Sequence, residues 1–298
     1  MPSPEVTVII PTLCCAKRSE ELVRAIRSVT EQQGVEIIVL VVVNGSLFDP
    51  ELLGKVSDTK GVKVLSLEVA GISNARFRGR QYVDTPYFLF LDDDDELYPF
   101  ALHDLLGKFS LSESDVGLVI ADAYNDYRSK NYGFYPSCSE IELHPLAALL
   151  DENWLIVQST LFKTEVVPSR IFDIKTNSNE CTMIAFNIAL ENIKIKVLDK
   201  VICVIHDKED SESKTEHFIT NEPYVIKWML TKDVPREIKI KLHRKLAAAF
   251  HNNSMYYLKR NVFLAAFVNH VKSMLISAGD SYFLYGRHIL NKFISRLF

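Results

Sequence analysis

The sequence has few cysteines and no long apolar run, the features that mark disulfide-rich, zinc-binding and membrane-spanning proteins. Only five of its 298 residues are cysteine, and no two of them form a CxxC pair. This odd, scattered set suggests neither a disulfide framework nor a zinc site, so reduced thiols in a cytosol fit best. No apolar run exceeds seven residues, as at 37–43, whereas a membrane-spanning helix needs about 20. The sequence therefore predicts no transmembrane segment.

The N-terminus also lacks the pattern of an exported protein. Glu5 and two prolines precede a short strand-like run, where a signal peptide would have a basic region followed by an apolar one. We therefore expect a cytoplasmic protein. The composition, 48% hydrophobic and 24% charged, is that of an ordinary globular chain and excludes disordered and collagen-like classes.

No single sign of charge dominates the chain, but the two signs are unevenly distributed. The net charge is −4, yet residues 233–298 contain 11 Lys and Arg against 3 Asp and Glu. Residues 1–232 contain 23 against 35. The acidic body argues against a nucleic-acid partner, whereas the basic tail makes an anionic membrane surface a candidate partner.

Alternating strand and helix patterns predict an α/β sheet in the first third of the chain. Residues 6–11 and 35–43 are continuous β-branched runs, typical of strands buried on both faces of a parallel sheet. Ser19 is placed to cap a helix between them, and apolar residues at helical spacing follow it. The same alternation continues with a strand at 62–67, a helix at 73–82, a strand at 87–91 and a helix after Pro99.

The second half of the chain changes character near residue 215. A strand at 116–121 is followed by an irregular stretch up to 139, then by the pattern of a helix at 145–150, a helix at 178–191 and a strand at 194–205. From about 216 the pattern is wholly helical. We therefore expect a domain over residues 1–215 and a helical region over 216–298, which either packs on that domain or associates with a membrane.

The strongest chemical signal is the run of five carboxylates at 92–96, directly after a buried strand. Such side chains repel one another unless a cation lies among them, and in an extended segment Asp92 and Asp94 would face the same ligand. Oxygen ligands without Cys or His nearby suit Mn²⁺ or Mg²⁺. The competing interpretation is a solvated acidic loop at the start of the next helix.

Four ordered motifs give a more specific indication. VTVIIPT, VEIIVLVVVNGS, GISNARFRGR and PYFLFLDDDDEL resemble the successive signatures of the family 2 nucleotide-sugar glycosyltransferases, over about residues 5–110 and more weakly to 213. The resemblance implies the A-type glycosyltransferase fold, a Rossmann-like α/β fold with an open mixed sheet, here with a C-terminal helical appendage. It also implies an inverting transferase that moves a sugar from a nucleotide diphosphate, most often UDP, to an acceptor hydroxyl.

The resemblance assigns roles to individual residues. It implies that Asp94 and Asp92 hold the metal, that Asp95 faces the sugar, and that the donor is bound by Pro11, Thr12, Asn44, Arg76, Asp92 and Asp93. The chain departs from the family pattern at two of these motifs. Asn44 stands where the family usually has an Asp that reads the base, and Phe77 replaces the Asn that usually follows the arginine. Arg80 lies on the same predicted helix as Arg76, and its sequence context fits a contact near the diphosphate and a solvated surface residue equally well.

The catalytic base is less clearly marked. The family places it in a Glu-Asp pair that opens a later helix, and the best match is Glu180 followed by Cys181, so Glu180 is the candidate base. Asp173 is an alternative base, and Glu180 as a mere helix-start acid is the structural alternative. His206 resembles a late family histidine that acts as a third metal ligand or contacts the diphosphate; a capped surface histidine is equally consistent.

The sequence alone leaves three functions open. The first is a metal-dependent inverting glycosyltransferase acting on a glycan or lipid-linked acceptor in surface polysaccharide or glycolipid assembly. It would be cytoplasmic or peripheral on the inner face of the cell membrane, with 256–298 as the membrane-contacting part. The second is a nucleotidyltransferase, although the loop at 12–19 lacks the glycine that class normally has. The third is a non-catalytic sugar-nucleotide-binding protein, favoured by the departures at Asn44, Phe77 and Cys181.

Overall fold

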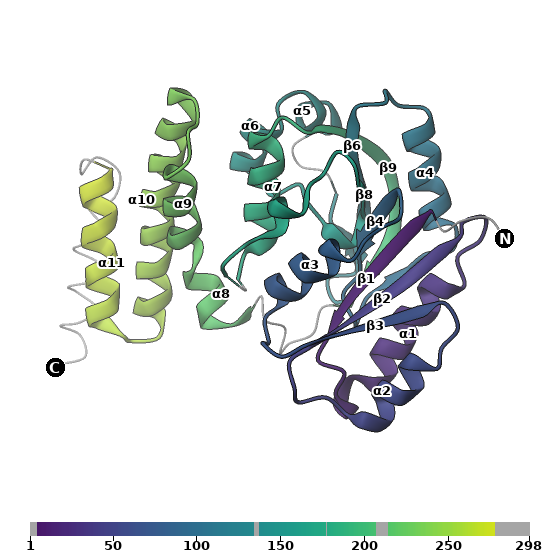
Figure 1. Ribbon diagram of the computed structural model, residues 1–298. Coiled ribbons are helices and arrows are strands. Elements are labelled where there is room, and N and C mark those ends of the chain that lie inside the picture. Colours follow the sequence, from purple (N-terminus) through teal and green to yellow (C-terminus); the bar gives the residue numbers. More distant parts are fainter. Residues whose placement is uncertain (1–4, 134–136, 177, 207–213, 278–298) are drawn as a thin grey trace. The chain divides into compact units, whose positions relative to one another are not determined.

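The computed structural model describes residues 5–133, 137–176, 178–206 and 214–277. By internal contacts the chain divides into two compact units, Met1–Lys208 and Glu209–Phe298. The sequence-based limits, 1–215 and 216–298, draw this division slightly later. We describe each unit by itself (Figure 1).

The first unit is built on a parallel sheet whose central strands are buried on both faces. β1 (Val6–Thr12) pairs in parallel with β2 (Ile37–Asn44) and with β4 (Tyr87–Phe90), and β2 pairs with β3 (Val62–Leu67). The strands are connected by α1 (Ser19–Thr30), α2 (Pro50–Ser57) and α3 (Ile72–Gln81). The predicted βαβ unit is therefore confirmed. The predicted cap is wrong, because α1 is capped at Arg18 and no side chain makes the capping bond.

The second half of this unit makes the sheet a mixed one. The strands run in the order β3-β2-β1-β4-β8-β6-β9-β5, and β7 pairs with β6. β8 is antiparallel to both β4 and β6, whereas β6 and β9 are parallel. These strands are β5 (Glu96–Leu97), β6 (Val116–Asn125), β7 (Lys130–Asn131), β8 (Thr160–Lys163) and β9 (Lys194–Ile205). The expected open mixed sheet of an α/β fold is confirmed.

Helices connect these later strands and carry part of the candidate site. They are α4 (Ala101–Ser110), α5 (Cys138–Leu143), α6 (Pro145–Asp151) and α7 (Glu180–Leu190), with short 3₁₀ turns η1 (Ala16–Arg18), η2 (Val157–Ser159) and η3 (Ser169–Phe172). α5 was not predicted from the sequence: it begins in the last two residues of the stretch expected to be irregular and continues to Leu143. Its capping box, in which Ser137 and Glu140 bond each other's backbone, is what starts it.

α3 lies unusually close to the sheet because of one glycine. A Cβ atom on Gly79 would come within 2.6 Å of Ile9 Cγ2 on β1 and 3.1 Å of Val42 Cγ2 on β2. Only a residue without a side chain permits this approach. The position of α3 above the sheet is therefore set at Gly79, one turn after Arg76.

The second unit is a set of helices. α8 (Glu216–Thr220) and α9 (Glu222–Leu230) precede the long α10 (Arg236–Lys259), which packs against α9 and α11 (Phe263–Ile276). Two serine hydroxyls join α10 to α11: Ser254 donates to the carbonyl oxygen of Ala266 at 2.7 Å, and Ser273 to that of Ala247 at 2.8 Å. None of the helices in the part of the chain described here is long and apolar enough to cross a membrane.

Candidate active site

The acidic run lies at the carboxyl end of β4, where it turns sharply. The backbone N–H of Asp95 donates to the carbonyl oxygen of Asp92 at 3.1 Å, so residues 92–95 form a turn. The sequence-based expectation that Asp92 and Asp94 face one ligand assumed an extended segment, whereas the backbone turns here. The carboxylates have partners of their own, some of them shared, such as Arg18 with Asp93 and Asp94.

Arg76 connects the acidic run to the start of α7. Its side chain is only 3% exposed, and its Nη2 lies 2.6 Å from Asp92 Oδ1. Its Nη1 donates to Glu180 Oε1. Burial opposes the charge on Arg76, but Asp92 and Glu180 outweigh it and raise the pKa of the guanidinium. A cation on α3 thus holds together two carboxylates that are 88 residues apart in the sequence.

Asp92 has a second partner that sequence analysis missed. Gln158, in η2, donates from Nε2 to Asp92 Oδ2 at 2.6 Å. Both oxygens of Asp92 are therefore held, one by a cation and one by an amide. A lone glutamine 66 residues from the run carries no motif, so only the fold could identify it.

Arg18 places a positive charge among the carboxylates, where the sequence analysis expects a divalent metal ion. Its Nη2 lies 2.9 Å from Asp93 Oδ1, and it also pairs with Asp94. Asp93 accepts a further bond from the Thr12 hydroxyl at 2.6 Å. Burial raises the pKa of Asp93 to about 6, against the opposing effect of Arg18. Arg18 lies just beyond the first loop, in no motif, so only the fold identifies it as a partner of the acidic run.

Asp95 and His206 tie the run to the end of β9. Asp95 is 2% exposed and accepts from the backbone N–H of His206 at 3.0 Å, and burial raises its pKa well above the ordinary value. The His206 ring has carboxylate partners on both nitrogens: Nε2 lies 2.7 Å from Glu96 Oε1, and Nδ1 bonds Asp126. To ligate a metal, His206 would have to release one of these carboxylates.

A divalent metal at Asp92 and Asp94 would share their oxygens with Arg76, Gln158 and Arg18, whereas at His206 it would have to displace a carboxylate from the ring. Among the described residues, no three His, Cys, Asp or Glu side chains converge as a ready-made metal centre. Mg²⁺ does not require one, because it commonly uses one or two carboxylates and completes its shell with water and substrate phosphates. The side chains of Asp92 and Asp94 are 29% and 23% exposed, so their oxygens are accessible to such an ion.

The start of α7 presents the candidate base. Asn179 has a left-handed backbone (φ 59°), which Asn tolerates better than most residues, and the helix opens at Glu180. Burial raises the pKa of Glu180, which makes the carboxylate a better proton acceptor. Burial likewise raises the pKa of the adjacent Cys181 thiol to about 12, so that the thiol stays protonated at neutral pH.

The remaining predicted residues fall in two groups. Pro11 and Thr12 end β1 and are buried, and the buried Asn44 at the end of β2 accepts from the Gly71 N–H at 2.7 Å, so that it secures the start of α3. Arg80 is structural: it donates to the carbonyl oxygens of Thr164 and Val167 and lies over the Phe88 ring.

The alternative base, Asp173, follows η3 and pairs with Lys175, two residues further on. Its carboxylate is 40% exposed, whereas that of Glu180 is 11% exposed. Asp173 is therefore the more solvated of the two candidate bases, and its ion pair is local.

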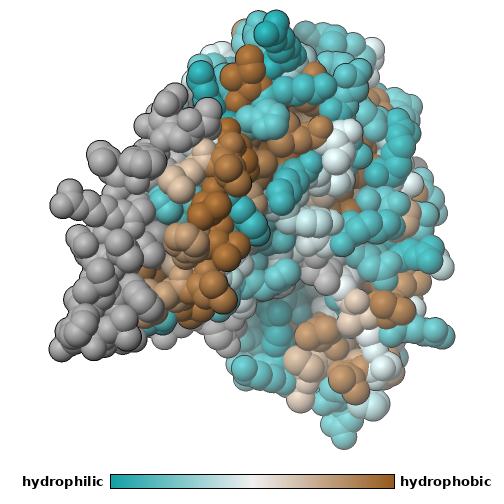
Figure 2. All heavy atoms as spheres, turned by 90° about the vertical axis from the view of Figure 1, so that its left-hand side faces the viewer, coloured by the Kyte–Doolittle hydropathy of each residue, from teal (hydrophilic) through white to brown (hydrophobic). Residues whose placement is uncertain are grey.

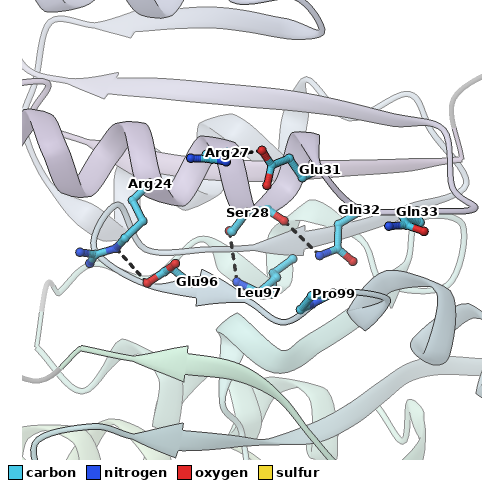
Figure 3. Close-up of a pocket in the computed structure, with 9 residues that line it drawn as sticks. All are labelled: Arg24, Arg27, Ser28, Glu31, Gln32, Gln33, Glu96, Leu97 and Pro99. Carbon is cyan, nitrogen blue, oxygen red and sulfur yellow. Dashed lines mark hydrogen bonds and ion pairs between the residues drawn. The ribbon is translucent and has the colours of Figure 1, made fainter.

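A separate pocket lies between α1 and β5 (Figure 3). It has a volume of about 650 Å³ and is lined on one side by Arg24, Arg27 and Glu31, on the other by Glu96 and Pro99. Arg24 Nε lies 2.9 Å from Glu96 Oε1. Asp92 to Asp95 are not among its lining residues, so this pocket is distinct from the network around Arg76.

Comparisons with known proteins agree with this geometry. The family described as Glycosyl transferase family 2 matches residues 7–192. No curated protein matches the chain. Among solved structures, S. aureus TarS 1–349 in complex with UDP-GlcNAc is similar with a TM-score of 0.62 and 17% identity, over 91% of this chain and 81% of that one. The same protein in complex with UDP gives 0.56 and 16%, over 87% and 75%.

Proposed function

The chain belongs to glycosyl transferase family 2, and from that premise we propose that it moves a sugar from a UDP-sugar to an acceptor hydroxyl with inversion. The observation that carries this proposal is the ion-pair network of Arg76. It brings Glu180, a candidate base from the second half of the fold, to Asp92, the first residue of the acidic run. A donor site and a proton acceptor would thereby lie side by side.

In the proposed reaction, the acceptor oxygen attacks the anomeric carbon and its proton passes to a Glu180 carboxylate oxygen. The bond from that carbon to the diphosphate breaks, and the nucleoside diphosphate leaves with the electron pair. Cys181 does not compete for the proton, because its pKa of about 12 makes its thiolate too scarce. Asp95 would face the sugar, as the resemblance implies.

Asp94 and Asp92 would hold Mn²⁺ or Mg²⁺, with His206 joining them only if Glu96 or Asp126 releases its ring. Such an ion supplies neutralisation of the charge that develops on the leaving diphosphate. Pro11, Thr12, Asn44, Arg76 and Asp93 would position the nucleotide part of the donor. Asn44 already uses its Oδ1 to hold Gly71, so its amide NH₂ would contact the base.

UDP is proposed as the nucleotide because the similar S. aureus TarS structures hold UDP-GlcNAc and UDP. The acceptor would be a glycan or a lipid-linked sugar, in surface polysaccharide or glycolipid assembly at the inner face of the cell membrane. A second candidate function is binding of a sugar nucleotide without transfer. It is favoured by one observation, the protonated thiol of Cys181 where the family has a carboxylate.

Donor binding by the Asp94→Ala variant tests the donor site. Calorimetry with UDP and UDP-GlcNAc, with and without Mn²⁺, should show metal-dependent binding to the wild type and its loss in Asp94→Ala, because the diphosphate would then meet the remaining carboxylates without its counter-ion. Asp84→Ala, which removes an exposed carboxylate before β4, is the matched control and should bind as the wild type does. Metal-dependent binding that survives in Asp94→Ala would refute the assignment of this site.

UDP release from UDP-sugars separates the two candidate functions. A transferase should release UDP, with or without an added acceptor, at a rate that rises with Mn²⁺. A protein that only binds sugar nucleotides should show the same calorimetric signal without any release above the uncatalysed rate.

A further inference from the structure

α11 buries polar and small side chains and exposes apolar ones. The fully buried residues of α11 are small or polar: Ala266, His270 and Ser273, all of them at most 1% exposed. The opposite face carries Leu264, Val268, Val271 and Leu275. A surface helix normally buries its apolar face and exposes its polar one. α11 does the reverse.

The outward residues form one continuous stripe. Positions 264, 268, 271 and 275 are separated by four, three and four residues, which places them on one side of the helix. Leu264 is 77% exposed, Leu275 78% and Val268 40%, and Phe267, beside them, is 55% exposed. We call these five residues the α11 stripe. An apolar band is visible in Figure 2.

The inner face explains why the stripe is not a packing error. The hydroxyls of Ser254 and Ser273 donate to backbone carbonyls across the α10 and α11 contact, at 2.7 and 2.8 Å. Turning the helix to bury the stripe would break both bonds and leave Ser254 and the Ala247 carbonyl of α10 facing apolar side chains. The sequence therefore specifies this orientation, and the exposed stripe is a consequence that needs a partner.

The charges around the stripe identify that partner. Lys259 and Arg260, at the turn that leads into α11, and Lys272, beside Val268 and Leu275, are all exposed cations. Arg260 lies over the Tyr256 ring and Lys272 over the Phe250 ring, both on α10, so neither has a carboxylate partner there. α11 contains no acidic residue, so a second copy docked through the same stripe would offer these cations no anion on that helix. An anionic lipid surface accepts both features, because its acyl region takes the apolar residues and its headgroups take the cations.

We infer that the α11 stripe is the surface through which this chain docks on an anionic lipid bilayer, lying in the interface without crossing it. The basic composition of the tail gave this role to residues 256–298 as a whole, of which 278–298 lie outside the described residues. The inference narrows the contact to one face of one helix. It does not depend on the glycosyl-transfer proposal, because no residue of the candidate active site takes part.

Co-sedimentation with vesicles tests the inference. The full chain should sediment with vesicles that contain phosphatidylserine and much less with phosphatidylcholine alone. Replacing Leu264 and Leu275 together by Ser should reduce the partition coefficient by at least about tenfold, since two buried leucine side chains are lost from the lipid contact. Leu111→Ser, at an equally exposed leucine of the first unit, is the matched control and should leave binding unchanged.

Three results would overturn the inference. The first is no sedimentation of the full chain with phosphatidylserine vesicles at low salt. The second is a wild-type dimer in sedimentation velocity that the Leu264→Ser, Leu275→Ser variant abolishes, since the stripe would then join two copies. The third is vesicle binding by the Leu264→Ser, Leu275→Ser variant that equals that of the wild type, which would place the lipid contact elsewhere in the chain. Equal thermal unfolding temperatures of variant and wild type exclude misfolding, and calorimetric UDP binding reports the donor site independently.

Discussion

The two units of this chain break the usual rule of burial in opposite ways. The first unit buries charge: the guanidinium of Arg76 and the carboxylate of Glu180 lie inside the protein, next to Asp92. The second unit exposes apolar side chains along the α11 stripe while it buries serine and histidine. Most side chains elsewhere follow the ordinary pattern, with a core of Val, Ile, Leu and Phe.

The difference lies in where each departure is compensated. Arg76 and Glu180, the buried charges of the first unit, have oppositely charged partners within the same unit, so their cost is offset inside the fold. The stripe is flanked by cations and faces outward, so its compensation must come from another surface. Internal compensation is what a preorganised reaction site needs, and external compensation is what a docking surface needs. Substitutions at Arg76 and Glu180, and chemical modification of Cys181, can break or sharpen this contrast.

The largest effect is expected from Arg76→Ala. Removing the cation leaves Asp92 and Glu180 without their shared partner, and breaking a buried ion pair in this way costs about 3–5 kcal/mol. Chemical denaturation should show this loss, and sugar transfer should fall with it. Arg78→Ala, two residues further along α3 and exposed, should change the free energy of unfolding by no more than about 0.5 kcal/mol.

Arg76→Lys keeps the protein testable if the alanine variant does not fold. A lysine supplies the charge but only one nitrogen, whereas Arg76 reaches Asp92 and Glu180 with two. The free energy of unfolding should therefore be partly restored, and the rate of sugar transfer restored to a smaller extent. Full transfer activity in Arg76→Lys would show that only the charge matters and that the fork geometry does not.

A smaller effect is expected from Glu180→Gln, which keeps the shape of the side chain but removes the proton acceptor. The turnover rate should fall by about 10²–10⁴-fold, whereas the affinity for the UDP-sugar donor should barely change. Steady-state kinetics and calorimetry on the same preparation measure the two quantities. Asp173→Asn is the companion variant. If it loses turnover while Glu180→Gln keeps it, Asp173 is the base and Glu180 only opens a helix.

The smallest effect concerns Cys181. Because burial raises the pKa of its thiol to about 12, iodoacetamide at pH 8 should leave it unmodified in the folded protein and modify it after denaturation. Cys15, which is half-buried, should react first. Peptide mass spectrometry of timed samples follows both sites. Modification of Cys181 at the rate of Cys15, which is half-buried as Cys181 is, would mean that the Cys181 thiolate forms more readily than its raised pKa allows.

The sequence predicted those parts of the molecule that rest on local periodicity. The runs that form β1 and β2 were recognisable because each strand is buried on both faces and is therefore apolar throughout. β8 was not foreseen. It is four residues long, and its place between β4 and β6 depends on pairing with strands that are distant in the sequence.

The residues of the candidate site also fall into those that the sequence predicted and those that only the fold identifies. The acidic run and Arg76 were visible as motifs, but their partners were not, because Gln158 and Arg18 belong to no pattern and meet the run only through the fold. The backbone at 92–95 differs from the extended segment that the sequence analysis assumed for Asp92 and Asp94. Side-chain alternation holds only in extended backbone, and the turn at 92–95 is a local feature that a run of acidic residues does not reveal.

Gly79 limits how this site can diversify. The missing methyl group at Gly79 fixes the height of α3 over β1 and β2, and that helix carries Arg76 one turn away. Side chains at the strand ends can be exchanged one at a time to accept a different donor, since each alters only its own contacts. Any change at Gly79 would instead lift the helix and shift every contact of Arg76 at once. A protein engineer who varies the donor site should therefore leave Gly79 unchanged.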